Sequence, residues 1–171
     1  LIESGAADAA GLGSEHLALA CASHNGAPLH VEKVERWLSG LDLCDDDLRC
    51  GGHFPMDDTT ALAMRCAGEE PRQVHNNCSG KHTGFLTLAR HLGAGPEYLE
   101  IDHPVQGAVR AAVQDLTDEP CDSHAIDGCS APNFAVSLEG FARGLAAFAA
   151  YDAVGGGRGA AMARLVAAMM T

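Results

Sequence analysis

The feature that most constrains this chain is a ten-residue segment, residues 75–84, that sets reactive side chains directly before an apolar run. The segment reads HNNCSGKHTG, and the residues after it follow a helical apolar period. Asn77 or Ser79 suits the N-terminal cap of a helix, and Gly93 suits the position just after its end. The pattern predicts a helix over residues 79–92 whose reactive groups gather at its start.

Cys78 and Lys81 carry the chemistry of this predicted helix start. Residues three apart lie on one face of a helix, with their Cβ atoms about 5–6 Å apart. The positive end of the helix dipole and a neighbouring ammonium both favour a thiolate. The plain alternative is an inert buried cysteine beside a surface lysine. We favour a functional pair, because Lys33 is the only other lysine in the chain.

Composition sets the class of protein. The 171 residues make one domain that is large enough to bury a core, and the formal charge of −12 argues against nucleic acid or an anionic membrane as a partner. No run approaches the ~18 apolar residues that span a bilayer. The seven cysteines are odd in number and form no C-x-x-C motif, which favours reduced thiols in the cytoplasm over a disulfide framework.

Both ends of the sequence suggest that it is part of a longer chain. The first residue is Leu1 rather than methionine, and residues 161–171 stop inside a helical pattern without a C-cap. We therefore expect residues 1–171 to be a single domain that is an incomplete piece lacking both ends.

The first half of the chain alternates apolar runs with turns. Residues 17–22 are an unbroken apolar run that predicts a buried strand, although periodicity alone does not exclude a helix. The run ends in Ser23 and His24, at a turn. Pro28–Gly40 is strongly amphipathic and predicts a helix with Trp37 in the core, and residues 57–67 predict another.

The second half predicts two further helices and one short strand. Pro104 opens an amphipathic helix, and residues 124–126 predict a strand that ends at a turn carrying Asp127. Ser137 caps a helix that runs to about Tyr151. The glycines at 155–157 predict a linker before a last helix from about residue 159.

Three clusters compete for one site: Ser23 with His24, residues 78–82, and Asp127 with Cys129. In one interpretation, Cys78 and Cys129 bind zinc together with Lys81 or a histidine, leaving a coordination position open. In the other, a hydroxyl or thiol nucleophile works with a lysine base in acyl transfer. The residues alone leave both open.

Three segments carry a resemblance to a known family. Residues 21–26 (CASHNG), 75–82 (HNNCSGKH) and 127–129 (DGC) resemble the signatures of the class 3, rhizobial-type L-asparaginases, the asparaginase II family. The likeness runs in order over nearly the whole chain. It implies an α/β fold similar to that of the serine β-lactamases and penicillin-binding proteins, with helices packed on a sheet. It also implies homodimers that hydrolyse L-asparagine to L-aspartate and ammonia.

The resemblance also implies roles for particular residues. Cys78, Lys81 and Cys129 would hold zinc near the substrate. Ser23 would be the second serine of a paired Ser-Lys catalytic apparatus, with Lys81 also counted as catalytic. Three further residues would bind substrate or support the site: His24, His82 and Asp127.

The chain departs from the family pattern in three ways. The family's Ser-x-x-Lys pair lies upstream of Leu1, a further catalytic lysine lies downstream of Thr171, and Ala27 stands where the family commonly has glutamate. We therefore expect these residues alone to bind metal but to be inactive. Two alternatives stay open: a catalytically dead zinc or amino-acid binding module, and a hydrolase with Cys78 as its nucleophile.

Overall fold

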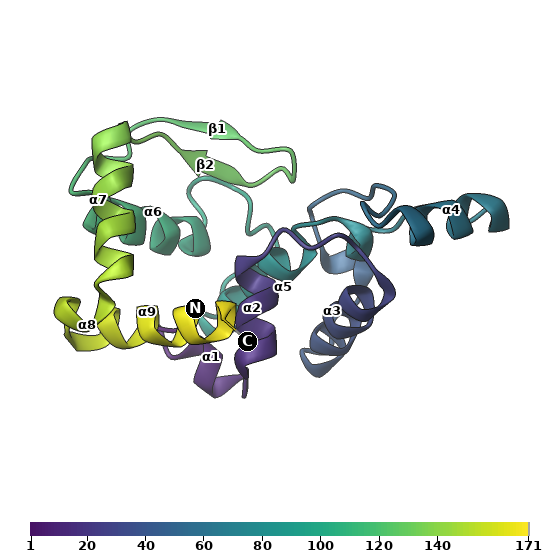
Figure 1. The fold of residues 1–171 in the computed structure, drawn as a ribbon, viewed down its shortest axis with the longest axis horizontal. Helices are drawn as coiled ribbons and strands as arrows, with labels where there is room; N and C mark the ends of the chain where they lie inside the picture. The colour runs from purple at the N-terminus through teal and green to yellow at the C-terminus, as the bar shows by residue number, and fades with distance from the viewer. Residues whose placement is uncertain (171) are drawn as a thin grey trace.

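The computed structural model describes residues 1–170, and several helices gather around one central helix, α5 (Figure 1). In chain order the elements are α1 Ala6–Ala9, α2 Ser14–Cys21, α3 Pro28–Gly40, the 3-10 turn η1 Asp45–Asp47, α4 Asp58–Ala67, the 3-10 turn η2 Gln73–His75, α5 Ser79–His91, α6 Pro104–Thr117, β1 His124–Ile126, β2 Pro132–Phe134, α7 Leu138–Ala149, α8 Tyr151–Val154 and α9 Gly156–Met169. In Figure 1, α6, α7 and the strands lie on one side of α5, and α3 and α4 lie on the other.

The central helix confirms the prediction made for residues 79–92. It packs against α1, α2, α3 and α6, and most of its residues are buried. Gly93, with φ +63°, takes the left-handed conformation just after the helix end, where glycine costs little. Thr83 and Thr87 are buried too, and their hydroxyls donate to the carbonyls of Ser79 and Thr83 at 2.9 and 2.8 Å. The two threonine hydroxyls can therefore be buried because they have partners, whereas the Nε2 of the equally buried His82 has none among the described residues.

Close packing at the start of α5 depends on a glycine. A Cβ atom at Gly80 would lie 2.5 Å from the carbonyl oxygen of Leu19 in α2. No side chain fits there, so the backbones of α2 and α5 approach more closely than two ordinary helices can.

Most helices predicted from apolar periodicity are confirmed. The helix at Pro28–Gly40 has the predicted bounds, and Trp37 is buried as expected. Pro104 occupies the first turn of α6, where its missing N–H is not needed. Ser137 caps α7, because its hydroxyl oxygen accepts the Gly140 N–H at 2.9 Å.

Two predicted elements are wrong. Residues 17–22 belong mostly to the helix α2 rather than to a strand, and α2 packs against α5 and α9. The misjudgement has a physical cause, since a short apolar run buried on several sides shows the same pattern in either structure. The glycines at 155–157 are not a linker throughout, because α9 already begins at Gly156.

The strand at residues 124–126 is confirmed, and it pairs with a second strand that the sequence did not predict. β1 and β2 form an antiparallel two-stranded sheet in which Ile126 faces Pro132 and His124 faces Phe134. Helices and strands are thus both present, consistent with the α/β class, but the helices described here pack chiefly on one another. The likeness to serine β-lactamases stays a prediction.

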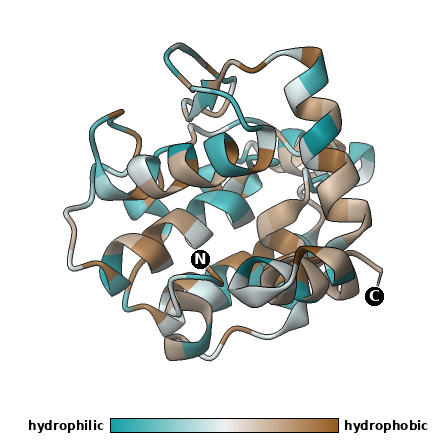
Figure 2. Cartoon of the chain, turned by 90° about the vertical axis from the view of Figure 1, so that its left-hand side faces the viewer, coloured by the Kyte–Doolittle hydropathy of each residue, from teal (hydrophilic) through white to brown (hydrophobic). Residues whose placement is uncertain are grey.

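The hydrophobic core lies between α5 and its neighbours. One cluster joins residues of α3 and α5 to Tyr98, Val105 and Cys129, and a second surrounds Trp37. Figure 2 shows apolar and polar residues mixed along the helices, as amphipathic packing requires. Among residues 1–170, none of the helices combines the length and the apolar character that crossing a membrane demands. All seven cysteines are free.

Candidate active site

Cys78 stands at the N-terminal cap position of α5, where it is half-buried. Neither Asn77 nor Ser79 caps the helix, so that prediction is wrong. The Asn76 side chain bonds to the backbone here instead. Its Oδ1 accepts the Cys78 N–H at 2.8 Å, and its Nδ2 donates to the carbonyls of Cys50 and Gly51 at 2.9 and 3.0 Å. Asn76 ties the start of α5 to a loop 25 residues earlier and thereby holds Cys78 in place.

Lys81 lies one turn further along the same helix. Its Nζ donates to the Cys129 Sγ at 3.1 Å, so the amine is turned toward a thiol that lies 48 residues away in the sequence. The Lys81 Nζ also lies 5.9 Å from the centre of the Phe85 ring, within the range of a cation–π contact.

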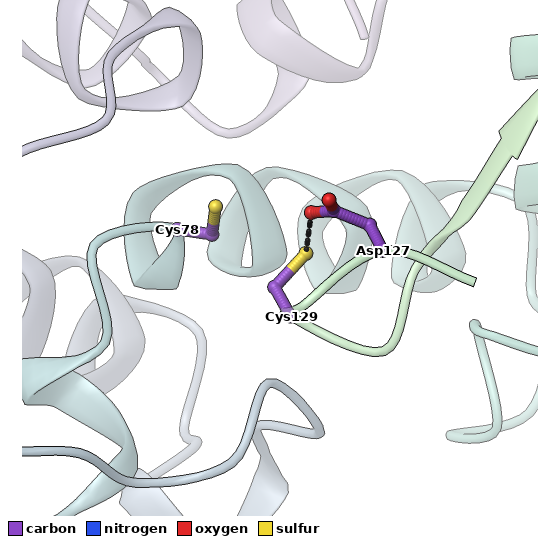
Figure 3. A group of neighbouring side chains, drawn as sticks. All are labelled: Cys78, Asp127 and Cys129. Carbon is purple, nitrogen blue, oxygen red and sulfur yellow. Dashed lines mark hydrogen bonds between the residues drawn. The ribbon is translucent and has the colours of Figure 1, made fainter. Parts of the chain in front are cut away.

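The loop between β1 and β2 brings the other half of the site. The Ser130 N–H donates to the Asp127 carbonyl at 2.8 Å, which forms the turn. The Asp127 N–H donates to the Ala131 carbonyl at 2.9 Å, which closes the loop. Ser130 adopts a left-handed backbone, with φ +67°. Figure 3 shows the result: Asp127 and Cys129 lie on a loop that reaches the start of α5, beside Cys78.

Cys129 links the amine to a carboxylate. Its thiol is buried and donates to the Asp127 Oδ2 at 3.0 Å while accepting from Lys81. Hydrogen bonds from the Cys129 thiol and the Gly128 N–H hold the pKa of the exposed Asp127 carboxyl below its usual range. Lys81, Cys129 and Asp127 therefore form a continuous chain of hydrogen bonds across the site.

The electrostatics at Cys78 differ from the expectation of a ready thiolate. Burial raises the pKa of the Cys78 thiol, and the Lys81 ammonium offsets only part of that rise. Proximity to the neighbouring Cys129 thiol raises the pKa further, because two thiolates repel each other. A free Cys78 is thus a protonated thiol near neutral pH, and a thiolate at the helix start stays a prediction.

Three of these side chains could hold a metal ion. The ligand atoms of Cys78, Asp127 and Cys129 all lie within 4.8 Å of one another. In a tetrahedral zinc site two ligand atoms stand about 3.3–3.8 Å apart, so small side-chain movements would suffice. Two thiols and a carboxylate match the ligand types that zinc prefers, and three protein ligands leave a fourth position open. The residues present therefore fit a zinc ion.

Ser23 is exposed on the loop between α2 and α3. The neighbouring His24 donates its backbone N–H to the Asn77 carbonyl at 3.1 Å, which places Ser23 next to the segment that leads into Cys78. The loop that carries Ser23 and His24 therefore lies beside the segment that leads into Cys78, and Asp127 and Cys129 approach the start of α5 from the loop between β1 and β2. The residue at 27 is half-buried, and its N–H donates to the Asn25 Oδ1 at 3.2 Å, so the turn closes with alanine in that place.

His24 and His82 are both buried, His82 completely. Burial is the main reason that the pKa of His24 falls to about 4 and that of His82 to about 3. Both rings are therefore neutral at physiological pH. Neither side chain is open to a substrate in this arrangement, and a supporting role for each stays a prediction.

Tyr98 supports the site from behind, and nothing in the sequence pointed to it. Its hydroxyl accepts the Arg49 N–H at 2.7 Å, so its own proton is free for the His82 Nδ1 at 2.9 Å. Burial raises the pKa of the tyrosine hydroxyl well above its ordinary value. Finding such a partner from sequence would require knowing which loop packs behind α5.

An apolar cavity of about 260 Å³ adjoins Lys81 on another side. Its walls include Leu17, Phe85 and Leu165, and Glu3 is the other charged residue that lines it. A polar amino acid finds few partners in such walls. The polar groups gather instead around Cys78, Asp127 and Cys129.

Two thiols, an amine and a carboxylate around one point form a site suited to metal binding or amide hydrolysis. A protein-family model described as L-asparaginase II matches residues 1–171. The chain belongs to the L-asparaginase II family, as the resemblance implied. The name of the family supports an amidohydrolase role with asparagine, a small molecule, as the substrate. Among curated proteins, no significant match is found.

Proposed function

We propose that this chain carries part of the active site of an enzyme that hydrolyses L-asparagine to L-aspartate and ammonia. The observation that carries the proposal is the family match over residues 1–171, joined to the convergence of the side chains at the start of α5. Lys81, Asp127 and the two cysteines provide a proton donor, a proton acceptor and metal ligands within one small region.

The proposed chemistry is acyl transfer at the side-chain amide. A serine hydroxyl attacks the amide carbon, and a lysine takes the hydroxyl proton and passes it to the leaving nitrogen, so that ammonia departs. Water then attacks the acyl-enzyme ester and releases aspartate. We assign Ser23 as the second serine of this apparatus and Lys81 as its lysine partner. Because no Ser-x-x-Lys sequence occurs in residues 1–171, we expect these residues alone to turn over little or no substrate.

We also propose a zinc site next to this apparatus. Cys78 and Cys129 would hold the ion with Lys81 as a neutral amine, and Asp127 offers an alternative oxygen ligand. When bound, zinc would orient or polarise the substrate carbonyl. Ligation also deprotonates the thiols, whose burial otherwise favours the protonated form.

Three finer features follow the family resemblance and belong to the proposal. They are a fold similar to that of serine β-lactamases and penicillin-binding proteins, a homodimer, and location in the cytoplasm. The seven free cysteines support a reducing compartment.

Metal content tests the proposed zinc site. Zinc per chain should be similar in the wild type and in Cys66→Ala, whose thiol is exposed on α4 away from the site. It should fall severalfold in Cys129→Ala, which loses one of the two sulfur ligands. Equal zinc in the wild type and Cys129→Ala would remove Cys129 from the site.

Ammonia release from L-asparagine tests the enzyme proposal, using the protein as its gene encodes it. Turnover that is lost in Ser23→Ala and Lys81→Met supports the Ser-Lys mechanism. No turnover, with zinc retained, would favour a binding module for zinc or an amino acid.

Thiol alkylation tests the remaining alternative, a Cys78 nucleophile. That alternative requires alkylation to abolish activity at every zinc concentration, and it requires Cys78→Ser to retain less activity than Cys129→Ser. The raised pKa of the Cys78 thiol supports the serine mechanism instead.

A further inference from the structure

The loop that carries Ser23 is fastened to the segment before α5. This loop, residues 22–27, joins α2 to α3 and has an extended backbone at Ala22, with φ −90° and ψ 152°. Successive side chains of an extended backbone point to opposite sides. His24 is directed inward, with 4% of its surface exposed, whereas Ser23 is exposed. The anchoring of His24 therefore decides where the Ser23 hydroxyl stands.

A chain of hydrogen bonds anchors His24. The Gly26 N–H donates to the His24 Nδ1 at 3.1 Å, so Nδ1 carries no proton and the Nε2 of the neutral ring must carry it. Nε2 then donates to the Ser79 Oγ at 2.9 Å, and the Ser79 hydroxyl donates to the Val74 carbonyl at 3.0 Å. The ring nitrogens of His24 and the hydroxyl of Ser79 thus all have partners in this series of hydrogen bonds, and Ser79 is fully buried.

Two glycines, Gly26 and Gly80, allow neighbouring backbone segments to approach closely beside these hydrogen bonds. A Cβ atom at Gly26 would lie 3.0 Å from the His75 carbonyl oxygen, and Gly26 also adopts φ +73°. Gly80, directly after Ser79, allows a still closer approach, since a Cβ there would lie 2.5 Å from the Leu19 carbonyl oxygen. The loop and the start of α5 are thus held in one register by contacts that leave no room for adjustment.

Ser79 therefore links the loop that carries Ser23 to the start of α5. It directly follows Cys78, and within residues 1–170 the Ser23 hydroxyl makes no hydrogen bond that could place it independently. We propose that Ser79 and His24 are positioning residues that hold the loop carrying Ser23 against the segment that leads into Cys78. The proposal rests on the proposed asparaginase function and extends it to residues that never touch the substrate.

Kinetics of Ser79→Ala in the protein as its gene encodes it provide the first test. Removing the hydroxyl leaves the His24 Nε2–H without its acceptor, so the loop keeps its backbone bonds to Asn77 and Asp57 but loses its side-chain anchor. Misplacement of a reacting group by about 1 Å can cost on the order of a hundredfold in rate, so kcat for asparagine should fall about 10- to 100-fold. KM and zinc content should stay close to those of the wild type, because the metal ligands are unchanged.

Thr87→Ala is the matched control. Thr87 is also buried in α5, and its hydroxyl donates to the Thr83 carbonyl at 2.8 Å, two turns away from Ser79. Its loss should destabilise the fold about as much while leaving kcat unchanged. Equal kcat values in Ser79→Ala and Thr87→Ala would overturn the proposal.

Two substitutions of His24 separate its two hydrogen bonds. His24→Gln keeps an N–H donor near the place of Nε2, and His24→Asn keeps an acceptor near the place of Nδ1. Because the bond to Ser79 carries the positioning, His24→Gln should retain more of kcat than His24→Asn. The combination of Ser79→Ala with His24→Asn should be no slower than His24→Asn alone. Fully additive losses would contradict a shared role.

Hydrogen–deuterium exchange tests the positioning even if the protein does not hydrolyse asparagine. The His24 N–H, bonded to the Asn77 carbonyl, reports whether the loop stays docked. Its exchange should become at least several times faster in Ser79→Ala and stay unchanged in Thr87→Ala. Unchanged exchange in Ser79→Ala overturns the positioning role. Absent turnover in the wild type, with faster exchange in Ser79→Ala, rejects the proposed function alone.

Discussion

The helices α5 and α7 are nearly the same length, 13 and 12 residues, yet their surroundings differ. The helix α5 is buried on most sides although its sequence is rich in small and polar residues. The helix α7 has the clearer apolar stripe, but Leu138, Phe141 and Leu145 remain 83%, 54% and 56% exposed. An apolar stripe therefore does not identify the central helix here. Small residues do, because they let neighbouring backbones approach.

The largest expected effect concerns the glycines of these two helices. A Cβ atom at Gly80 would lie 2.5 Å from the Leu19 carbonyl oxygen, and one at Gly140 would lie 2.6 Å from the Glu119 Cδ. The first neighbour is backbone and the second is the end of a flexible side chain. Gly80→Ala should cost more than about 3 kcal/mol or prevent folding, whereas Gly140→Ala should cost less than about 1 kcal/mol.

Urea denaturation followed by circular dichroism measures both effects. Gly84→Ala is the control within α5, because its Cβ would meet its nearest neighbours at an ordinary 3.7 Å. This variant should be neutral or up to about 1 kcal/mol more stable, since alanine favours a helix. The comparison fails if Gly80→Ala and Gly84→Ala unfold at the same urea concentration.

Acid should destabilise the fold through two buried histidines, one in α5 and one bonded to it, whereas α7 contains no histidine. His24 and His82 have pKa values of about 4 and about 3 in the folded chain, both lowered from 6.5 mainly by burial. Below pH 6.5 the unfolded chain therefore binds more protons than the folded one, so stability is fully present above that pH and falls as the pH drops toward 4.

Denaturation at pH 7, 6 and 5 measures this loss at pH values where ordinary carboxyls are still mostly ionised. At pH 5 each ring should account for roughly 2 kcal/mol of lost stability. His24→Gln should reduce the dependence on pH by its own share. A free energy of unfolding that stays constant from pH 7 to pH 5 would mean that the two rings are not buried as described.

The cap of α7 should matter moderately. The Ser137 oxygen accepts the Gly140 N–H, and its hydroxyl is also bonded to Glu119. Ser137→Ala should cost about 1 kcal/mol in urea denaturation, the usual value for losing an N-cap. Ser39→Ala, on an exposed position of α3, should cost nothing measurable. Equal stability of the two variants would show that this cap is dispensable.

The smallest effect is expected on the exposed stripe of α7. Leu138→Ala should change stability by less than about 0.5 kcal/mol, because most of the side chain already contacts water. Leu86→Ala in α5 removes a side chain that is 4% exposed and should cost about 2–5 kcal/mol. Similar losses in the two variants would erase the contrast between the helices.

Much of the fold is predictable because the pattern of a helix lies in residues that are close together in the sequence. The bounds of α3, the proline that opens α6 and the serine cap of α7 follow from spacing and from residues adjacent in sequence. Reliance on local pattern also explains why the strand predicted at residues 17–22 is wrong. A short buried helix and a short buried strand share one local pattern, and only the packing against α5 and α9 separates them.

The meeting of Cys78, Lys81 and Cys129 was expected from family resemblance, and the structure brings the three side chains together. Asn76, Ser79 and Tyr98 were missed in their present roles. Each acts through hydrogen bonds to residues far along the chain, such as those from Asn76 to Cys50 and Gly51. Such partners are decided by tertiary packing, which no local pattern encodes.

Because the loop between β1 and β2 meets α5 far along the chain, we expect the site to be completed late in folding. Closing a long stretch of chain costs entropy before any contact rewards it, and Lys81 meets Cys129 across 48 residues. The helix α5, with Cys78 and Lys81 at its start, can form before the loop that carries Asp127 and Cys129 reaches it. A bound ion at this point would favour the fully assembled chain over one whose hairpin is still undocked, so metal retention would report that folding is complete.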